Sequence, residues 1–66
     1  MTIIINSRPV DVPDGISLAE LASIRQIPSK GTAIAVNSRH VPRDKWTETK
    51  LQPSDNVLVI SASYGG

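Results

Sequence analysis

The chain ends in two consecutive glycines, Gly65 and Gly66, and this end is where its residues best suit chemistry. At average glycine usage, two terminal glycines arise by chance in about one chain in two hundred. They leave a carboxylate with no Cβ atom on either of the last two residues. The residues from Ser61 to Gly66 span about 20 Å when extended, enough to enter a narrow active site of another protein. We therefore favour a working carboxylate at Gly66, inserted together with Gly65, over an inert tail.

Apolar residues leading up to this end predict a surface for a partner. Leu58, Ile60 and Ala62 alternate along the last apolar segment, and Ile4 is expected nearby on the same face. Contiguous exposed apolar residues often mark a partner site, although a domain this small cannot bury all of its apolar surface. Tyr64 either anchors in a partner pocket, as interface tyrosines commonly do, or is a solvated residue. We favour the anchor.

The remaining polar residues assemble no catalytic or metal-binding set. His40 is the only histidine and cysteine is absent, so neither a nucleophile–base pair nor a zinc site is available. Asp11 with Asp14, and Asp44 with Glu48, are the candidate carboxylate pairs, and solvated charges are the favoured interpretation of both. Neither glycine-rich phosphate-binding motif occurs. We expect a chain that binds no nucleotide, metal or other cofactor by itself and is not an enzyme on its own.

Composition narrows the class of protein further. A chain of 66 residues forms one domain and buries only about 60% of the surface that its unfolded form exposes, which favours action with a partner. A net charge of +1 argues against nucleic acid. The apolar run at the N-terminus is too short for a signal peptide or a membrane span. The absence of cysteine is compatible with a reducing compartment, and the cytoplasm is the simplest expectation.

Apolar periodicity predicts a hairpin, a helix and further strands. Ser17 and Glu20 fit the S-x-x-E capping box, so a helix of about three turns begins there, and Pro28 with Gly31 bounds its end. β-branched residues and alternation mark the strands. The predicted strands are residues 2–6, 10–12, 32–37, a short edge segment at 40–42, and 57–60, with a turn at 7–9.

One helix can cover only one face of the sheet that these strands form. The crossover after the second strand lets the first and last strands lie side by side. We therefore predict an α+β fold of the β-grasp type, a mixed sheet of four to five strands in residues 1–63, followed by a flexible tail in residues 64–66. Alternation sends Ile4, Leu58 and Ile60 to the open face. The residues predicted to face the helix side are Ile3, Ile5, Leu21, Ile34, Val36, Val57 and Val59.

These features resemble the bacterial sulfur carrier proteins of thiamin biosynthesis, which are ubiquitin-like. The resemblance covers the whole chain, from the order of elements to the glycine pair. Its most specific part is AVN at residues 35–37 followed by VPRDKW at residues 41–46, which is similar to the A-[IV]-N and V-P-R-x-x-W pattern of these carriers. Relatives usually have a small or apolar residue where this chain has Tyr64. Within the motif, we expect Trp46 to pack over the end of the core and Arg43 to fix the short loop.

The resemblance implies a cycle that starts at the Gly66 carboxylate. An E1-like adenylating enzyme would use ATP and Mg²⁺ to form an acyl-adenylate there, and sulfur from a persulfide, supplied by a cysteine desulfurase or another donor, would convert it into a thiocarboxylate. A thiazole synthase would receive that sulfur. A free carboxylate is ionised at pH 7 and is a poor acyl donor, so activation must come first.

Three alternatives stay open on the sequence. The chain resembles, less closely, the small subunit of molybdopterin synthase, which uses the same kind of tail. It also fits a ubiquitin-like interaction module whose glycine pair has no chemical role. Finally, the activated end could be conjugated to lysines of other proteins, as in a protein modifier.

Overall fold

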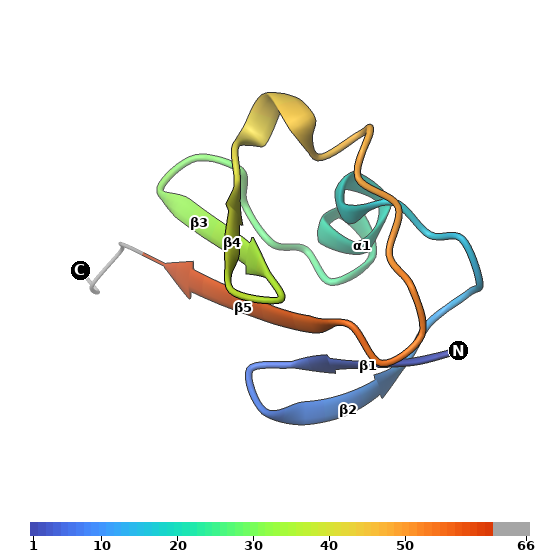
Figure 1. Ribbon diagram of the computed structural model, residues 1–66. Helices are drawn as coiled ribbons and strands as arrows, with labels where there is room; N and C mark the ends of the chain where they lie inside the picture. The colour runs from blue at the N-terminus through green and yellow to red at the C-terminus, as the bar shows by residue number, and fades with distance from the viewer. Residues whose placement is uncertain (62–66) are drawn as a thin grey trace.

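The computed structural model describes residues 1–61, which form a five-stranded sheet with one α-helix on one face (Figure 1). The sheet order is β2-β1-β5-β3-β4, with β1 parallel to β5 and the other neighbours antiparallel. The predicted β-grasp arrangement, with the first and last strands side by side, is confirmed. The elements are β1 (Thr2–Ile5), β2 (Arg8–Asp11), α1 (Leu18–Ile24), β3 (Thr32–Val36), β4 (Arg39–Val41), a 3-10 turn η1 (Arg43–Lys45) and β5 (Asn56–Ser61).

Both hairpins turn on an asparagine–serine pair. Positive φ angles of 49° and 69° at Asn6 and Ser7 mark a tight type I′ turn, so β2 begins at Arg8. The prediction of a turn over residues 7–9 and a strand from Val10 was therefore wrong. Pro9 is tolerated within β2 because β2 is an edge strand, where a missing N–H leaves no neighbour unpaired. The second pair, at residues 37 and 38, has φ angles of 51° and 70°.

The helix begins as predicted and ends earlier. Ser17 Oγ accepts from the Glu20 N–H at 3.1 Å, and Glu20 Oε1 accepts from the Ser17 N–H at 2.8 Å, which completes the capping box. The prediction of three turns was wrong, because α1 has 7 residues. Gln26 takes a left-handed conformation with φ 55°, and the Ile27 N–H donates to the Ala22 carbonyl at 2.8 Å, a Schellman ending without the usual glycine.

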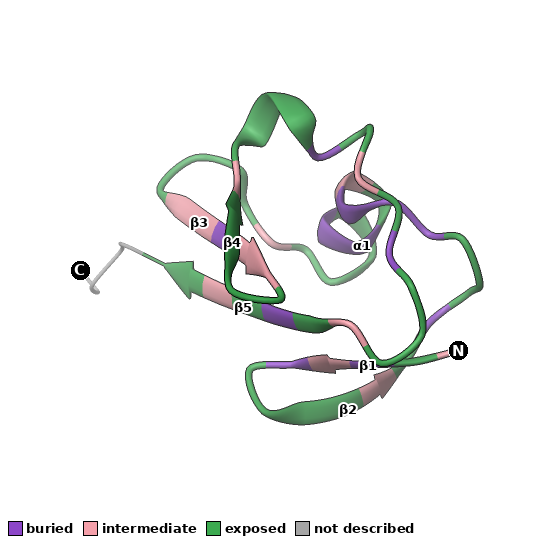
Figure 2. Ribbon diagram, viewed as in Figure 1, coloured by how far each residue is buried: buried purple, intermediate pink, exposed green. Residues whose placement is uncertain are grey.

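The core lies between α1 and the sheet (Figure 2). Trp46 and Leu51, from the segment that joins β4 to β5, are buried with it at 4% and 1% exposure. Five of the residues predicted to face the helix side are buried, and Val36 and Val59 are half-buried against the same cluster. The buried residues are Ile3, Ile5, Val12, Ile16, Ser17, Leu18, Leu21, Ala22, Ile34, Trp46, Leu51 and Val57.

No helix in residues 1–61 is long and apolar enough to cross a membrane. The predicted boundary between domain and tail, after residue 63, lies outside the described residues.

Candidate functional site

The C-terminal strand β5 occupies the middle of the sheet and carries the chain toward its glycine end (Figure 1). It is parallel to β1 on one side and antiparallel to β3 on the other. Val57 on its inner face is fully buried, so the strand is anchored in the core. Four predicted site residues, Ala62, Tyr64, Gly65 and Gly66, lie outside the described residues.

Leu58 and Ile60 stand on the open face of β5, as predicted from alternation. Their exposed fractions are 48% and 54%, which are high for large apolar side chains within a central strand. Their cross-strand partners on β3 are Ala35 and Ala33, whose short side chains leave the larger residues projecting from the sheet. The result is an exposed apolar area around Leu58 and Ile60.

Ile4 extends this area onto β1. It is half-buried and in register with Asn56, two positions before Leu58 on the same face of the sheet. His40 is opposite Ala35 on β4 and is exposed, as expected for a residue at the edge of the sheet. The structure thus brings three of the four residues predicted for the partner surface onto one face, which we call the open-face patch (Ile4, Leu58 and Ile60).

Polar side chains at the hairpin turns hold the two sides of β5. Asn37 Oδ1 accepts from the Asn56 N–H at 2.9 Å, and Asn37 Nδ2 donates to Asp55 Oδ1 at 3.0 Å. On the β1 side, Asn6 Oδ1 accepts from the Val59 N–H at 2.8 Å. These contacts were not predicted from the sequence. The signal was an asparagine followed by serine and arginine at the end of each apolar strand, at residues 6–8 and 37–39.

Of the two motif residues, Trp46 is buried in the core, as expected, whereas Arg43 contacts the rest of the motif through its backbone. Trp46 Nε1 donates to the Val41 carbonyl at 2.9 Å, and the Trp46 backbone carbonyl accepts from the Ala19 N–H at 3.1 Å, so the side chain and the backbone of Trp46 together connect β4 to α1. The Arg43 carbonyl accepts from the Trp46 N–H at 3.2 Å within η1, and the Arg43 side chain is exposed. This part of the motif shapes the fold.

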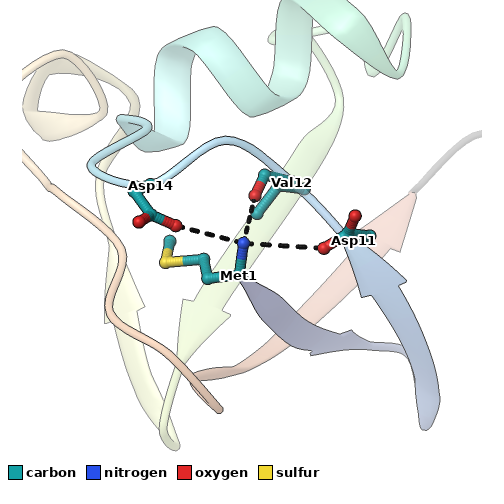
Figure 3. Close-up of polar contacts among 4 residues, drawn as sticks. All are labelled: Met1, Asp11, Val12 and Asp14. Atoms are coloured by element: carbon teal, nitrogen blue, oxygen red, sulfur yellow. Dashed lines mark hydrogen bonds and ion pairs between the residues drawn. The ribbon is translucent and has the colours of Figure 1, made fainter.

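The candidate carboxylate pairs do not form a reactive site. Asp11 and Asp14 both face the N-terminal ammonium of Met1, at 3.5 and 3.1 Å (Figure 3). That ammonium also donates to the Val12 carbonyl at 2.7 Å, and the hydrogen bond to Asp14 raises its pKa above the ordinary 8.0. This role of the two aspartates was not predicted from the sequence, because it depends on the position of the N-terminus in the folded chain.

Other charged groups also serve the fold. The hydrogen bond from the Ser17 N–H lowers the pKa of Glu20 below its ordinary range. Glu48 lies 4.0 Å from Lys45, an exposed ion pair of little energetic weight. Residues 1–61 contain neither a pocket nor a group of three metal-ligating side chains. Among the described residues, the feature that stands out is the exposed apolar pair Leu58 and Ile60 on β5.

Comparisons with known proteins agree with this arrangement. The model of the ThiS family matches residues 3–66. The sulfur carrier protein ThiS of Escherichia coli (strain K12) is 29% identical over 66 residues, which is the full length of both chains.

Two solved structures share the fold. A crystal structure of a thiamine biosynthesis protein (ThiS) from Geobacter metallireducens has a TM-score of 0.85 at 20% identity, with complete coverage of both chains. A solution structure of a thiamine biosynthesis protein from the same organism has a TM-score of 0.82 at 22% identity, covering 100% of this chain and 88% of the other. Since the family model spans nearly the whole chain, including the glycine pair, this protein belongs to the ThiS family.

Proposed function

We propose that this chain is a sulfur carrier of thiamin biosynthesis whose working group is the Gly66 carboxylate. The observation that carries the proposal is the family match over residues 3–66, which extends through both terminal glycines. The name of the Escherichia coli relative, a sulfur carrier protein of equal length, supports it. The central position of β5 supports it too, because that strand connects the core to the glycine end.

The proposed chemistry has an activation step and a sulfur step. In the first, a carboxylate oxygen of Gly66 attacks the α-phosphorus of ATP, and pyrophosphate leaves with Mg²⁺. In the second, the terminal sulfur of a cysteine persulfide attacks the activated carbonyl carbon, AMP leaves, and a thiol cleaves the resulting acyl disulfide. The products are the thiocarboxylate on Gly66 and a disulfide of the donor. The carrier then delivers this sulfur to thiazole formation.

The chain's own contribution is recognition and position. We propose that the open-face patch, continued by Ala62, binds the adenylating enzyme, and that Tyr64 and Gly65 enter its active site with Gly66. Binding of the enzyme would remove the exposed apolar surface of Leu58 and Ile60 from water, and this favours association. The glycines place no side chains beside the reacting carbonyl. Catalytic groups, ATP and Mg²⁺ belong to the partner, so the carrier is a co-substrate.

The partners follow from this cycle. They are an E1-like adenylating enzyme, a persulfide donor such as a cysteine desulfurase, and a thiazole synthase that receives the sulfur. We place all of these partners in the cytoplasm together with the carrier. The cytoplasm is a reducing compartment, which is compatible with a chain that has no disulfide. Neither nucleic acid nor a membrane has a part in the cycle.

The alternatives predict different outcomes. The ThiS family match favours thiamin biosynthesis over the small subunit of molybdopterin synthase. A plain interaction module would tolerate one residue added after Gly66, because its surface lies on the folded domain. A protein modifier would form adducts of higher mass on lysines of other proteins.

A pyrophosphate exchange assay tests the activation step. The adenylating enzyme, labelled pyrophosphate, ATP and Mg²⁺ are incubated with the wild-type chain, with a chain lacking Gly66, and with a chain carrying one alanine after Gly66. We expect exchange with the wild type and background exchange with both variants, although all three bind the enzyme through the same folded domain. Equal exchange with the extended chain would refute a working carboxylate at Gly66.

A further inference from the structure

The strand that carries the proposed docking residues is held differently on its two sides. On the β3 side, the register covers residues 57–61 of β5. On the β1 side, it covers only Asn56 and Val57, because β1 ends at Ile5 and the chain turns back into β2. Backbone pairing with β1 therefore stops before β5 reaches Leu58 and Ile60.

Asn6 continues the pairing beyond the end of β1. Its N–H donates to the Val57 carbonyl at 2.9 Å, and its side-chain Oδ1 accepts from the Val59 N–H at 2.8 Å. The side-chain oxygen thus stands where the next backbone carbonyl would stand if β1 ran on. This bond joins residues 53 positions apart and connects the first hairpin directly to the last strand.

The turn conformation allows Asn6 to serve both strands. Its φ of 49° is in the left-handed region, which asparagine, aspartate and glycine tolerate better than other residues. Glycine would keep the turn and lose the acceptor for Val59. Aspartate would keep both. The turn and the contact with β5 can therefore be separated by substitution.

We propose that Asn6 is a positioning residue that fixes β5 at Val59 and thereby sets the orientation of Leu58 and Ile60 before a partner binds. This inference rests on the proposed carrier function, because its consequence concerns recognition by the adenylating enzyme. A strand that is ordered in the free protein loses less conformational freedom on binding than a loosened one. Loss of the contact should therefore weaken binding of the carrier, with little effect on the reaction of the bound Gly66 carboxylate.

The test compares Asn6→Gly, Asn6→Asp and the control Ser7→Gly, which changes the same turn without touching Val59. Amide hydrogen exchange at Val59 reports the contact, and KM and kcat for the carrier in pyrophosphate exchange report recognition. Both are measured at a temperature where every variant is folded. We expect Asn6→Gly to speed exchange at Val59 about fivefold, the value of one modest hydrogen bond. We expect the same variant to raise KM about threefold or more with kcat little changed.

The two other variants are controls for the loss of the acceptor and for the change of the turn. Asn6→Asp should keep Val59 protection and KM close to the wild-type values, and Ser7→Gly should do the same. Unchanged exchange at Val59 in Asn6→Gly would overturn the inference, as would faster exchange with an unchanged KM, since the contact would then be structural only. A wild-type chain that supports no pyrophosphate exchange with an active enzyme would instead overturn the proposed function, and every variant would then fail alike.

Discussion

Asn37 and Asp55 are joined by a 3.0 Å hydrogen bond in which the Asn37 amide Nδ2 donates to Asp55 Oδ1. Asn37 Oδ1 accepts from the Asn56 N–H, and Asp55 Oδ2 accepts from the Gln52 N–H at 2.8 Å. Both ends of the Asn37 amide are therefore in use. The contact fastens the β3–β4 turn to the residue that precedes β5, so the strand enters the sheet in a defined register.

Replacing Asn37 with aspartate should destabilise the fold. The substitution keeps the acceptor for Asn56 and turns the donor toward Asp55 into a second carboxylate, so a hydrogen bond becomes a repulsion. We expect a loss of about 1 kcal/mol in the free energy of unfolding at pH 7, measured with urea. The matched control is Asn6→Asp, because the contact of the Asn6 side chain with the Val59 N–H needs only an acceptor. Equal losses in the two variants would contradict the role of the Asn37 donor.

The N-terminal ammonium predicts a pH dependence above neutrality. Its hydrogen bond with Asp14 and the nearby Asp11 charge raise its pKa above 8.0, so the folded chain holds this proton more tightly than the unfolded chain. Its stabilising contribution is fully present below pH 8 and is lost as the pH rises through the folded pKa. Urea midpoints measured between pH 7 and pH 10 should fall accordingly.

Two variants identify the source of that pH dependence. Asp14→Asn should reduce it more than Asp11→Asn, because Asp14 lies 3.1 Å from the ammonium and Asp11 lies 3.5 Å away. Chemical acetylation of the amine should reduce it further. A slope that is the same in wild type and Asp14→Asn would show that other groups titrate in this range.

We expect substitutions in the open-face patch to weaken recognition by the adenylating enzyme with little effect on the stability of the fold. Leu58→Ser changes an exposed side chain, so we expect a change of about 0.5 kcal/mol or less in the free energy of unfolding. The KM for the carrier in pyrophosphate exchange should nevertheless rise, since the variant removes apolar surface from the proposed interface. Ile24→Ser is the control, because Ile24 is 62% exposed at the end of α1, away from this face. A similar rise in KM for both variants would contradict a docking role for the patch.

The end of α1 offers a stabilising substitution. Gln26 takes a φ of 55° at the position where Schellman endings usually have glycine. Gln26→Gly should relieve the left-handed conformation and stabilise the chain by about 0.5 kcal/mol or more in urea unfolding. Ser23→Gly, in the last turn of the helix, should destabilise it by about 0.5 kcal/mol, because glycine has a lower helix propensity than serine. A loss of stability in Gln26→Gly would show that the glutamine makes a compensating contact.

Local patterns predicted most of the fold. Alternation in β1 and β5 placed Ile3 and Val57 in the core and Leu58 on the open face, because side chains on a strand change faces at every residue. The capping box located the start of α1 because its two hydrogen bonds depend on residues only three apart. The order of the elements includes only one helix, which can cover only one face of the sheet, and this predicted the β-grasp arrangement.

The parts that escaped prediction depend on contacts that leave little local pattern. The helix ends at Ile24 because Gln26 takes a left-handed backbone conformation, at a position where the sequence has no glycine to indicate it. The hydrogen bond from the Val59 N–H to Asn6 joins residues 53 positions apart. The ammonium of Met1 contacts Asp14 only when β1 and β2 have paired. The chemistry of Gly66 remains a prediction from the sequence and the family.

The most direct test of the carrier function is the intact mass of the chain after incubation with the adenylating enzyme, ATP, Mg²⁺, cysteine, a cysteine desulfurase and a thiol. The proposal predicts a mass gain equal to the exchange of one oxygen for one sulfur, located at Gly66 by fragmentation. A chain lacking Gly66 should show no gain. An unchanged mass in the wild type, with partner enzymes that convert another ThiS carrier in parallel, would contradict the account.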